Sequence, residues 1–156
     1  MAMPSTFASV FTFGVSRHPV NRLYSAYRFC RAGCTGEMGI RNPNQYQSKE
    51  FETFESFVSS WLVFQDLRKV DGVFRPQHFY LCKNTKIIVN KVFKFEKLGE
   101  VEASLSTILE KEIHLSQSNV SPAKEEKIID QKIIDIIEDL YHLDYKIFGY
   151  SPRTDA

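Results

Sequence analysis

The sequence predicts one α/β domain in which a short parallel sheet is flanked by several helices. Two short segments, Phe11–Val15 and Ile87–Val89, are rich in β-branched or aromatic residues, which is typical of strands. Helix-like segments, in which apolar residues recur every three or four positions, follow the strand-like ones along the chain. A length of 156 residues fits one compact domain, residues 1–156, and is too short for two ordinary ones.

The first predicted strand leads directly into the first predicted helix. Phe11–Val15 is followed by Arg17 and His18, and Pro19 stands at a position that suits the first residue of a helix. The helix is expected over residues 19–31, and its apolar residues share one face: Leu23, Ala26, Tyr27 and Cys30. We therefore expect a strand, a tight turn and a helix in immediate succession.

The remaining elements follow from the same two patterns. Residues 32–50 contain three of the seven glycines and several polar turn formers, so they predict a long loop. A β-branched run predicts a strand at Lys86–Asn90, which we expect to lie next to Phe11–Val15, and a further extended piece is expected near Val92–Phe95. Helices are predicted at 53–67, 100–112 and 126–146.

Composition excludes several classes of protein. A formal net charge of +1 and the lack of an extended basic face disfavour a nucleic-acid-binding domain. Three cysteines cannot build a disulfide framework, and although Cys30 and Cys34 are four residues apart, no further ligands stand nearby, so we expect no metal site. The sequence has no apolar run long enough to span a bilayer.

The turn between the first strand and the first helix predicts an anion-binding site. The free backbone N–H groups at a helix N-terminus and the helix dipole both favour negative charge. Arg17 lies at this turn and can offer a bidentate guanidinium that matches a phosphate. Ser25 lies about 9 Å further along the helix axis, where its hydroxyl can meet a phosphate beside the helix.

The segment "RHPVNRLYSAYR", residues 17–28, resembles the 3′-phosphate-binding motif of the sulfotransferases that use 3′-phosphoadenosine 5′-phosphosulfate (PAPS). The similarity is greatest to the Golgi carbohydrate-sulfotransferase branch and its bacterial and viral relatives. It extends through "FRPQHFYL", "VFKFEKLGE" and the ending "IEDLYHLDYKIFGY", and covers nearly the whole chain from Phe11. The resemblance implies the P-loop-like α/β fold of that family.

The resemblance also implies an activity. In that family a sulfuryl group passes from PAPS to a hydroxyl, often of a carbohydrate, without a metal. By the resemblance, Arg17 and Ser25 contact the 3′-phosphate of the donor. Eukaryotic relatives are Golgi membrane proteins, whereas a prokaryotic member would be cytoplasmic.

Two departures from the family pattern qualify this prediction. The family has Asp or Asn where His18 stands, and because histidine caps a helix less well, we expect a weaker helix start. The 5′-phosphosulfate loop of the family lies upstream of the motif, and only 16 residues precede Arg17. The chain therefore resembles the C-terminal two-thirds of a sulfotransferase, and we expect no useful sulfate transfer by this chain alone. The alternative is a non-catalytic nucleotide-binding or scaffold protein derived from a sulfotransferase.

No catalytic base is identified by the sequence. His78 is a weak candidate for a base or an acceptor-binding residue, and a turn histidine without a catalytic role is the more common case. Glu96 ends the second extended piece, where a structural role is expected. The lysines from Lys83 to Lys97 predict a solvated face.

Overall fold

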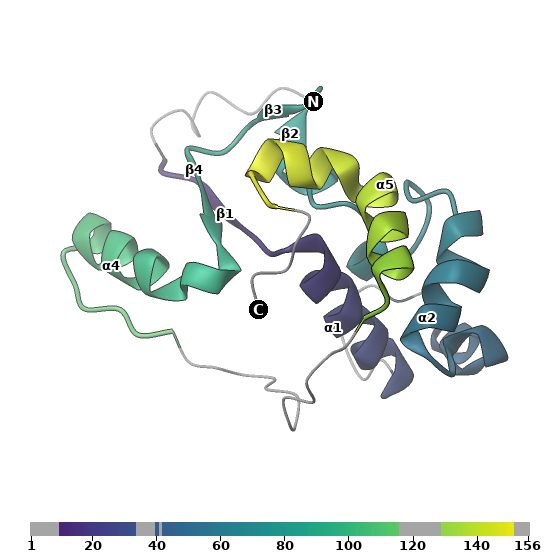
Figure 1. Ribbon diagram of the computed structural model, residues 1–156. Helices are drawn as coiled ribbons and strands as arrows, with labels where there is room; N and C mark the ends of the chain where they lie inside the picture. The colour runs from purple at the N-terminus through teal and green to yellow at the C-terminus, as the bar shows by residue number, and fades with distance from the viewer. Residues whose placement is uncertain (1–9, 34–39, 41, 116–128, 152–156) are drawn as a thin grey trace.

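The computed structural model describes residues 10–33, 40, 42–115 and 129–151 (Figure 1). Its helices and strands are β1 Phe13–Ser16, α1 Pro19–Arg31, α2 Phe54–Ser56, α3 His78–Leu81, β2 Cys82–Lys83, β3 Lys86–Ile87, β4 Lys91–Lys94, α4 Leu98–Leu109 and α5 Gln131–Phe148. Short 3-10 helices occupy Pro43–Gln47, Lys49–Phe51, Leu62–Phe64, Gly72–Phe74 and Phe95–Lys97. Strands β1 and β4 lie between α4 on one side and α1, α2 and α5 on the other (Figure 1). The predicted architecture, a short parallel sheet flanked by helices, is confirmed.

The parallel sheet pairs β1 with β4. Phe13 lies opposite Lys91 and Ser16 opposite Lys94 in a parallel register. The predicted neighbour of β1, Lys86–Asn90, is wrong. Lys86 and Ile87 form β3 instead, which pairs with β2 in a separate antiparallel hairpin.

A tight turn explains why the β-branched run does not join the parallel sheet. Asn84 and Thr85 both have positive φ, at 49° and 64°, which is the backbone of a two-residue hairpin turn. This turn folds β3 back onto β2 at once. The extended piece expected near Val92–Phe95 is therefore the segment that becomes β4 and reaches β1.

Helix α1 has the predicted bounds and apolar face. Pro19 takes the first helical position, and Arg28 and Arg31 lie in the last turn, where cations interact favourably with the helix dipole. His18 occupies the N-cap position without a side-chain cap bond, in line with the weak start expected for a histidine there. The buried residues of the helix are Pro19, Val20, Leu23, Tyr27 and Cys30.

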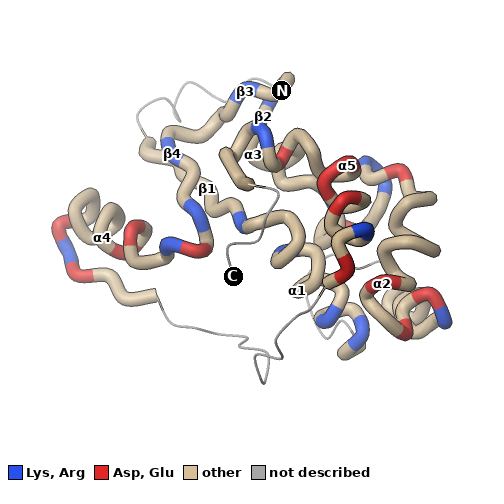
Figure 2. The backbone as a smooth tube through the Cα atoms, viewed as in Figure 1, with Lys and Arg blue, Asp and Glu red and all other residues tan. Residues whose placement is uncertain are grey.

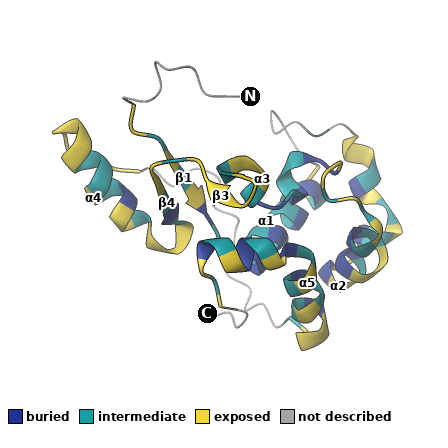
Figure 3. Ribbon diagram, turned by 90° about the horizontal axis from the view of Figure 1, so that it is seen from above, coloured by how far each residue is buried: buried dark blue, intermediate teal, exposed yellow. Residues whose placement is uncertain are grey.

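An aromatic core joins α1 to the segment around α2 and to α5. Phe51, Phe57 and Phe74 are fully buried, and the ring of Tyr27 stacks on Phe57 with centroids 5.4 Å apart. Burying a phenylalanine side chain contributes roughly 1.5–3 kcal/mol, so these rings supply a large part of the stability. The darkest part of Figure 3 coincides with α1, the segment around α2 and α5.

The helix predicted at 53–67 is present but changes its winding. After α2 the chain makes a π-helical turn at Phe57–Trp61 and a 3-10 turn at Leu62–Phe64. This irregular winding directs Phe54, Phe57, Val58 and Leu62 into the core. Part of the predicted loop 32–50 also forms 3-10 helices, while residues 34–39 and 41 lie outside the described residues.

Helices α4 and α5 correspond to the predicted helices 100–112 and 126–146, with shifted ends. Residues 126–128 lie outside the described residues. Helix α5 is bent at Tyr141, where φ is −113° and ψ is 20°. The buried Tyr141 hydroxyl donates a hydrogen bond to the Phe74 carbonyl at 2.6 Å, which fixes the bend against the aromatic core.

Charged residues are spread over the described surface. Figure 2 shows acidic residues along α4 and α5 and basic residues on the strands and at the end of α1. Lys83, Lys86, Lys91 and Lys97 are exposed, which agrees with the predicted solvated face, whereas Lys94 is half-buried and donates to the Gly149 carbonyl at 2.7 Å.

Candidate functional site

The turn at Ser16–His18 is held by side chains from distant parts of the sequence. Gln77 forms two hydrogen bonds with Arg17: its Oε1 accepts from the Arg17 N–H at 2.8 Å, and its Nε2 donates to the Arg17 carbonyl at 2.8 Å. A strand neighbour would offer the same donor and acceptor. The Gln77 amide therefore takes the place of a peptide group beside the end of β1.

Asp144 in turn fixes the position of Gln77. This carboxylate is fully buried and accepts hydrogen bonds from the backbone N–H groups of Gln77, at 2.6 Å, and His78, at 2.9 Å. It also lies 2.7 Å from Nδ1 of the His78 ring. Buried carboxylates need such partners, because leaving one unpaired is very costly. Helix α5 thus supports the turn through α3.

Glu96 and Tyr150 hold the other side of the turn. Glu96 accepts from the His18 N–H at 2.8 Å and from the Tyr150 hydroxyl at 3.1 Å. The Ser16 hydroxyl lies 3.1 Å from the Tyr150 hydroxyl. The structural role expected for Glu96 is therefore confirmed.

The His18 side chain is buried behind the turn rather than directed at the first helical N–H groups. Its Nε2 lies 2.9 Å from the Ser151 carbonyl, and because a carbonyl only accepts, Nε2 carries a proton. Its ring packs edge-on against Tyr145 and Tyr150. His18 Nδ1 is buried without a hydrogen-bond partner in the described part of the chain.

The backbone of Arg17 is held in place by hydrogen bonds, whereas its guanidinium has only a ring contact. The guanidinium carbon lies 4.5 Å from the centroid of the Phe95 ring. Within the described residues the guanidinium makes no hydrogen bond or ion pair. Partial burial lowers the pKa of Arg17, and the nearby Glu96 and Tyr150 oppose that shift. A cation with unfilled donors at a helix N-terminus can accept an anion.

Ser25 lies on α1, as predicted. It is half-buried, and among the residues that the structure describes its hydroxyl makes no hydrogen bond. Many helical serines donate to the carbonyl four residues earlier, so this free hydroxyl is available to a ligand. Arg17 and Ser25 are thus placed at the start of α1 and about two turns into it.

Arg22, the second arginine near the start of α1, has a structural role. Its guanidinium donates to the carbonyls of Arg75, at 2.8 Å, and Gly72, at 3.4 Å. Burial lowers the pKa of Arg22, and Tyr141, Asp144 and Tyr80 oppose that shift. Arg22 therefore ties α1 to the turn before α3.

His78, the weak catalytic candidate, lies at the start of α3. Its side chain is 13% exposed, and its ring packs against Phe79 with centroids 4.5 Å apart. A proton on Nδ1 that is shared with Asp144 leaves Nε2 as an acceptor. Nε2 of His78 can therefore accept a proton, but the contact of Nδ1 with Asp144 equally serves to anchor the turn.

Sequence reasoning did not assign roles to Gln77 and Asp144. Asp144 carries a signal that was available: it lies on the buried stripe of α5 between Tyr141 and Phe148, where a carboxylate must be paired. Nothing in the sequence, however, names a partner 66 or 67 residues away.

Comparison with protein families matches residues 2–151 to the sulfotransferase family. The chain belongs to the sulfotransferase family. This membership implies a sulfate donor such as PAPS and a hydroxyl acceptor, and it confirms the family predicted from the motif at Arg17. Searches of curated proteins and of solved structures found no match to this chain.

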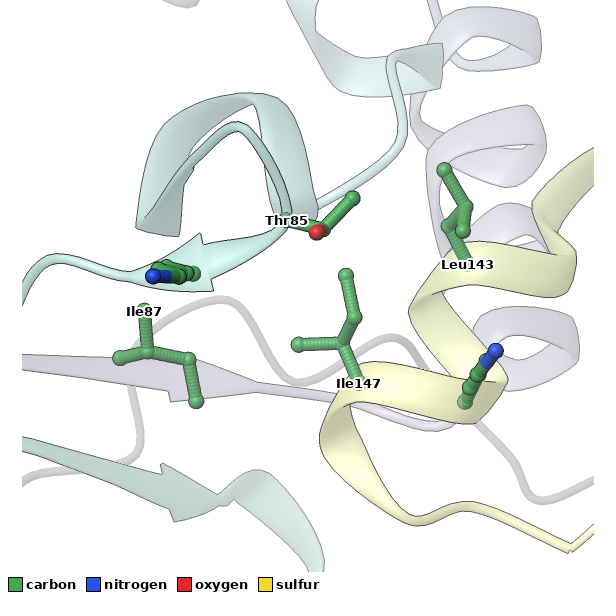
Figure 4. A pocket seen from close by; sticks show the side chains of 6 residues that line it. Thr85, Ile87, Leu143 and Ile147 are labelled. Carbon is green, nitrogen blue, oxygen red and sulfur yellow. The ribbon is translucent and has the colours of Figure 1, made fainter.

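A cleft is lined by residues other than those of the turn. The cleft, of about 490 Å³, is lined by Thr85, Lys86, Ile87, Leu143, Lys146 and Ile147. Figure 4 shows Ile87, Leu143 and Ile147 directed toward the space between the β2–β3 hairpin and the end of α5. Arg17, Ser25 and His78 are not among its lining residues.

Two further features are absent from the described residues. No group of three or more His, Cys, Asp or Glu side chains gathers there in a metal-binding arrangement, and Cys34 lies outside that part of the chain. No described helix combines the length and the apolarity needed to cross a membrane.

Proposed function

We propose that this sulfotransferase-family chain binds PAPS by its 3′-phosphate, with Arg17 and Ser25 as the phosphate ligands. The observation that carries the proposal is the state of Arg17: its backbone is fixed by Gln77, yet among the described residues its guanidinium has the Phe95 ring as a neighbour and makes no hydrogen bond or ion pair. Because the backbone of Arg17 is already held at a helix N-terminus, its side chain needs little rearrangement to accept a phosphate.

The reaction that we propose is transfer of the sulfuryl group from PAPS to a hydroxyl of a carbohydrate. The S–O bond to the leaving phosphate breaks as the acceptor oxygen bonds to sulfur, and a base takes the acceptor proton. Arg17 and Ser25 hold the end of the donor that does not react. They therefore contribute equally to the ground state and the transition state, which lowers KM rather than raising kcat.

A non-catalytic nucleotide-binding role is the second candidate. It is favoured by the structural roles of Gln77, Glu96 and Asp144. These side chains hold the turn and do not act on a substrate, and His78, the remaining candidate base near the turn, is itself bound to Asp144.

We propose further that the 156-residue chain alone transfers sulfate too slowly to be useful, because the groups that we assign lie at the unreactive end of the donor. An assay with labelled PAPS and a panel of carbohydrates tests the non-catalytic role, because measurable turnover would exclude it. Robust turnover by this chain would contradict the low-activity proposal.

Calorimetry with 3′-phosphoadenosine 5′-phosphate tests the assigned ligands. We expect Arg17→Ala to weaken binding by about 1.5–3 kcal/mol, the range for a hydrogen bond to a charged group. Ser25→Ala should weaken it by a similar or smaller amount. Arg68→Ala and Ser60→Ala are matched controls on exposed residues, and they should bind like the wild type. Equal affinity in all variants would remove the assignment.

A further inference from the structure

Three buried polar atoms lie where the start of α1 meets α5. They are Nδ1 of His18, Oε1 of Glu138 and the hydroxyl of Tyr145, and none has a hydrogen-bond partner among the residues that the structure describes. His18 and Tyr145 are each only 7% exposed. Buried side-chain polar atoms are nearly always hydrogen-bonded, so three unpaired atoms in one region require an explanation.

The three side chains are neighbours in space. Glu138 and Tyr145 are about two turns apart on α5, which places them on the same side of that helix. His18 stands at the N-cap of α1, and its ring packs edge-on against the Tyr145 ring with centroids 5.4 Å apart. Helices α1 and α5 pack against each other, so these side chains lie at the junction of the two helices.

The charge of Glu138 acts on both of the other side chains. Burial raises the pKa of Glu138, as do Asp135 and Asp139, whereas His18 lowers it. Burial raises the pKa of Tyr145, and Glu138 raises it further. Glu138 is therefore close enough to His18 and Tyr145 to share a small polar ligand with them.

The three atoms cannot satisfy one another. Nε2 of His18 donates to the Ser151 carbonyl at 2.9 Å, so Nδ1 of the neutral ring is an acceptor. The carboxylate oxygen of Glu138 is also an acceptor, and only the Tyr145 hydroxyl has a hydrogen to donate. One hydroxyl hydrogen cannot serve two acceptors, so any direct contact leaves one acceptor unpaired.

We propose that one buried water bridges α1 and α5, accepting from the Tyr145 hydroxyl and donating to Nδ1 of His18 and Oε1 of Glu138. A water has two hydrogens and two lone pairs, which complement two acceptors and one donor. Buried waters typically make about three hydrogen bonds to polar groups that lack other partners. The water holds the His18 ring in the tautomer that donates to Ser151, next to the turn that carries Arg17.

A crystal structure at a resolution that places ordered waters tests the site directly. We expect one water at hydrogen-bonding distance, about 2.7–3.2 Å, from all three atoms. A Tyr145 hydroxyl bonded directly to Glu138 or His18, with no water between them, would overturn the proposal.

Urea denaturation of Tyr145→Phe is an independent test, because the presence and absence of the water predict different outcomes. If the water joins the hydroxyl to its neighbours, removing the hydroxyl breaks a hydrogen bond, and the urea midpoint should fall. If the hydroxyl is buried and unpaired, removing it relieves a desolvation penalty, and the midpoint should rise or stay the same. Tyr80→Phe, at an exposed tyrosine, is the matched control and should change the midpoint little. A midpoint that does not fall in Tyr145→Phe contradicts the bridge.

A double-mutant cycle tests whether Glu138 and Tyr145 share one partner. Because the bridge needs both side chains, Tyr145→Phe should lower the midpoint less in a Glu138→Ala background than in the wild type. Asp139→Ala, at the exposed neighbour of Glu138, should leave the effect of Tyr145→Phe unchanged. The same effect of Tyr145→Phe in all three backgrounds would show that the two side chains act separately, and the proposal would be wrong.

Discussion

Asp144 shows how much of the turn depends on one buried side chain. Its two oxygens accept from two backbone N–H groups, and one of them lies 2.7 Å from the His78 ring, while the carboxylate has no exposed surface. Removing it leaves several buried donors without an acceptor, and each such group costs about 1–3 kcal/mol.

We therefore expect Asp144→Ala to lower the free energy of unfolding by about 3–5 kcal/mol, the range for breaking a buried pair. Urea denaturation measures this change. Asp139→Ala, an exposed position on the same helix, should stay within about 0.5 kcal/mol of the wild type. A small effect of Asp144→Ala would show that Gln77 and His78 find other partners.

Buried tyrosines predict a loss of stability at alkaline pH. Burial raises the pKa of Tyr141, Tyr145 and Tyr150 above the ordinary value of 10.0. Above about pH 10 the unfolded chain has released phenol protons that the folded chain retains, so the free energy of unfolding falls as pH rises. Tyr141→Phe should be less stable at neutral pH but lose less with pH, whereas the exposed Tyr80→Phe should keep the wild-type slope. The urea midpoints of the wild type and both variants, measured from neutral pH to above about pH 10, test this prediction.

The same residues mark the limit of prediction from sequence. Arg17 and Ser25 could be proposed from the sequence because they stand within one local motif, a strand followed by a helix. The partners that hold the motif, Gln77, Glu96 and Asp144, act across long sequence separations. The sequence does not show that Gln77 and Glu96 reach the turn, and the buried stripe of α5 indicates only that Asp144 needs a partner, without naming it.

At the scale of elements, the hairpin β2–β3 decides which segment joins β1. The β-branched run at Ile87–Val89 has the composition of a buried strand, and composition alone favoured it as the partner of β1. The positive φ angles of Asn84 and Thr85 instead fold this run onto β2. Periodicity located the helices well because their apolar faces are set locally. Strand pairing depends on turns and on tertiary contacts, so it was not predicted.

Thr85 predicts a stabilising substitution within this hairpin. A β-branched residue at a φ of 64° is strained, by of order 1–3 kcal/mol, and glycine adopts this conformation freely. We expect Thr85→Gly to raise the free energy of unfolding by about 0.5–1 kcal/mol after the entropic cost of glycine. Thr85→Ala removes the same hydroxyl without relieving φ, and it should give no gain. Thermal unfolding of the two variants compares them directly.

At the scale of the whole molecule, the turn links regions that are far apart in the chain. It receives hydrogen bonds or ring contacts from α3, the segment after β4 and the end of α5. A ligand held at the turn should therefore stabilise the entire fold rather than one helix.

Thermal unfolding with nucleotides tests this link. At about a hundred times its Kd, 3′-phosphoadenosine 5′-phosphate should add about 2.7 kcal/mol to the free energy of unfolding and raise Tm. Adenosine 5′-phosphate lacks the 3′-phosphate and should raise Tm much less. Equal shifts by the two nucleotides would mean that the 3′-phosphate is not recognised.

The parallel pairing of β1 with β4 has a consequence for how the chain folds. The residues that it joins, such as Thr12 and Asn90, are 78 positions apart, so a long loop must close before the pair gains any contact energy. The hairpin and the helices need only local contacts and can form earlier. The turn that carries Arg17 is therefore expected to mature late in folding, and a nascent chain that has not yet completed α5 has no Asp144 with which to hold it.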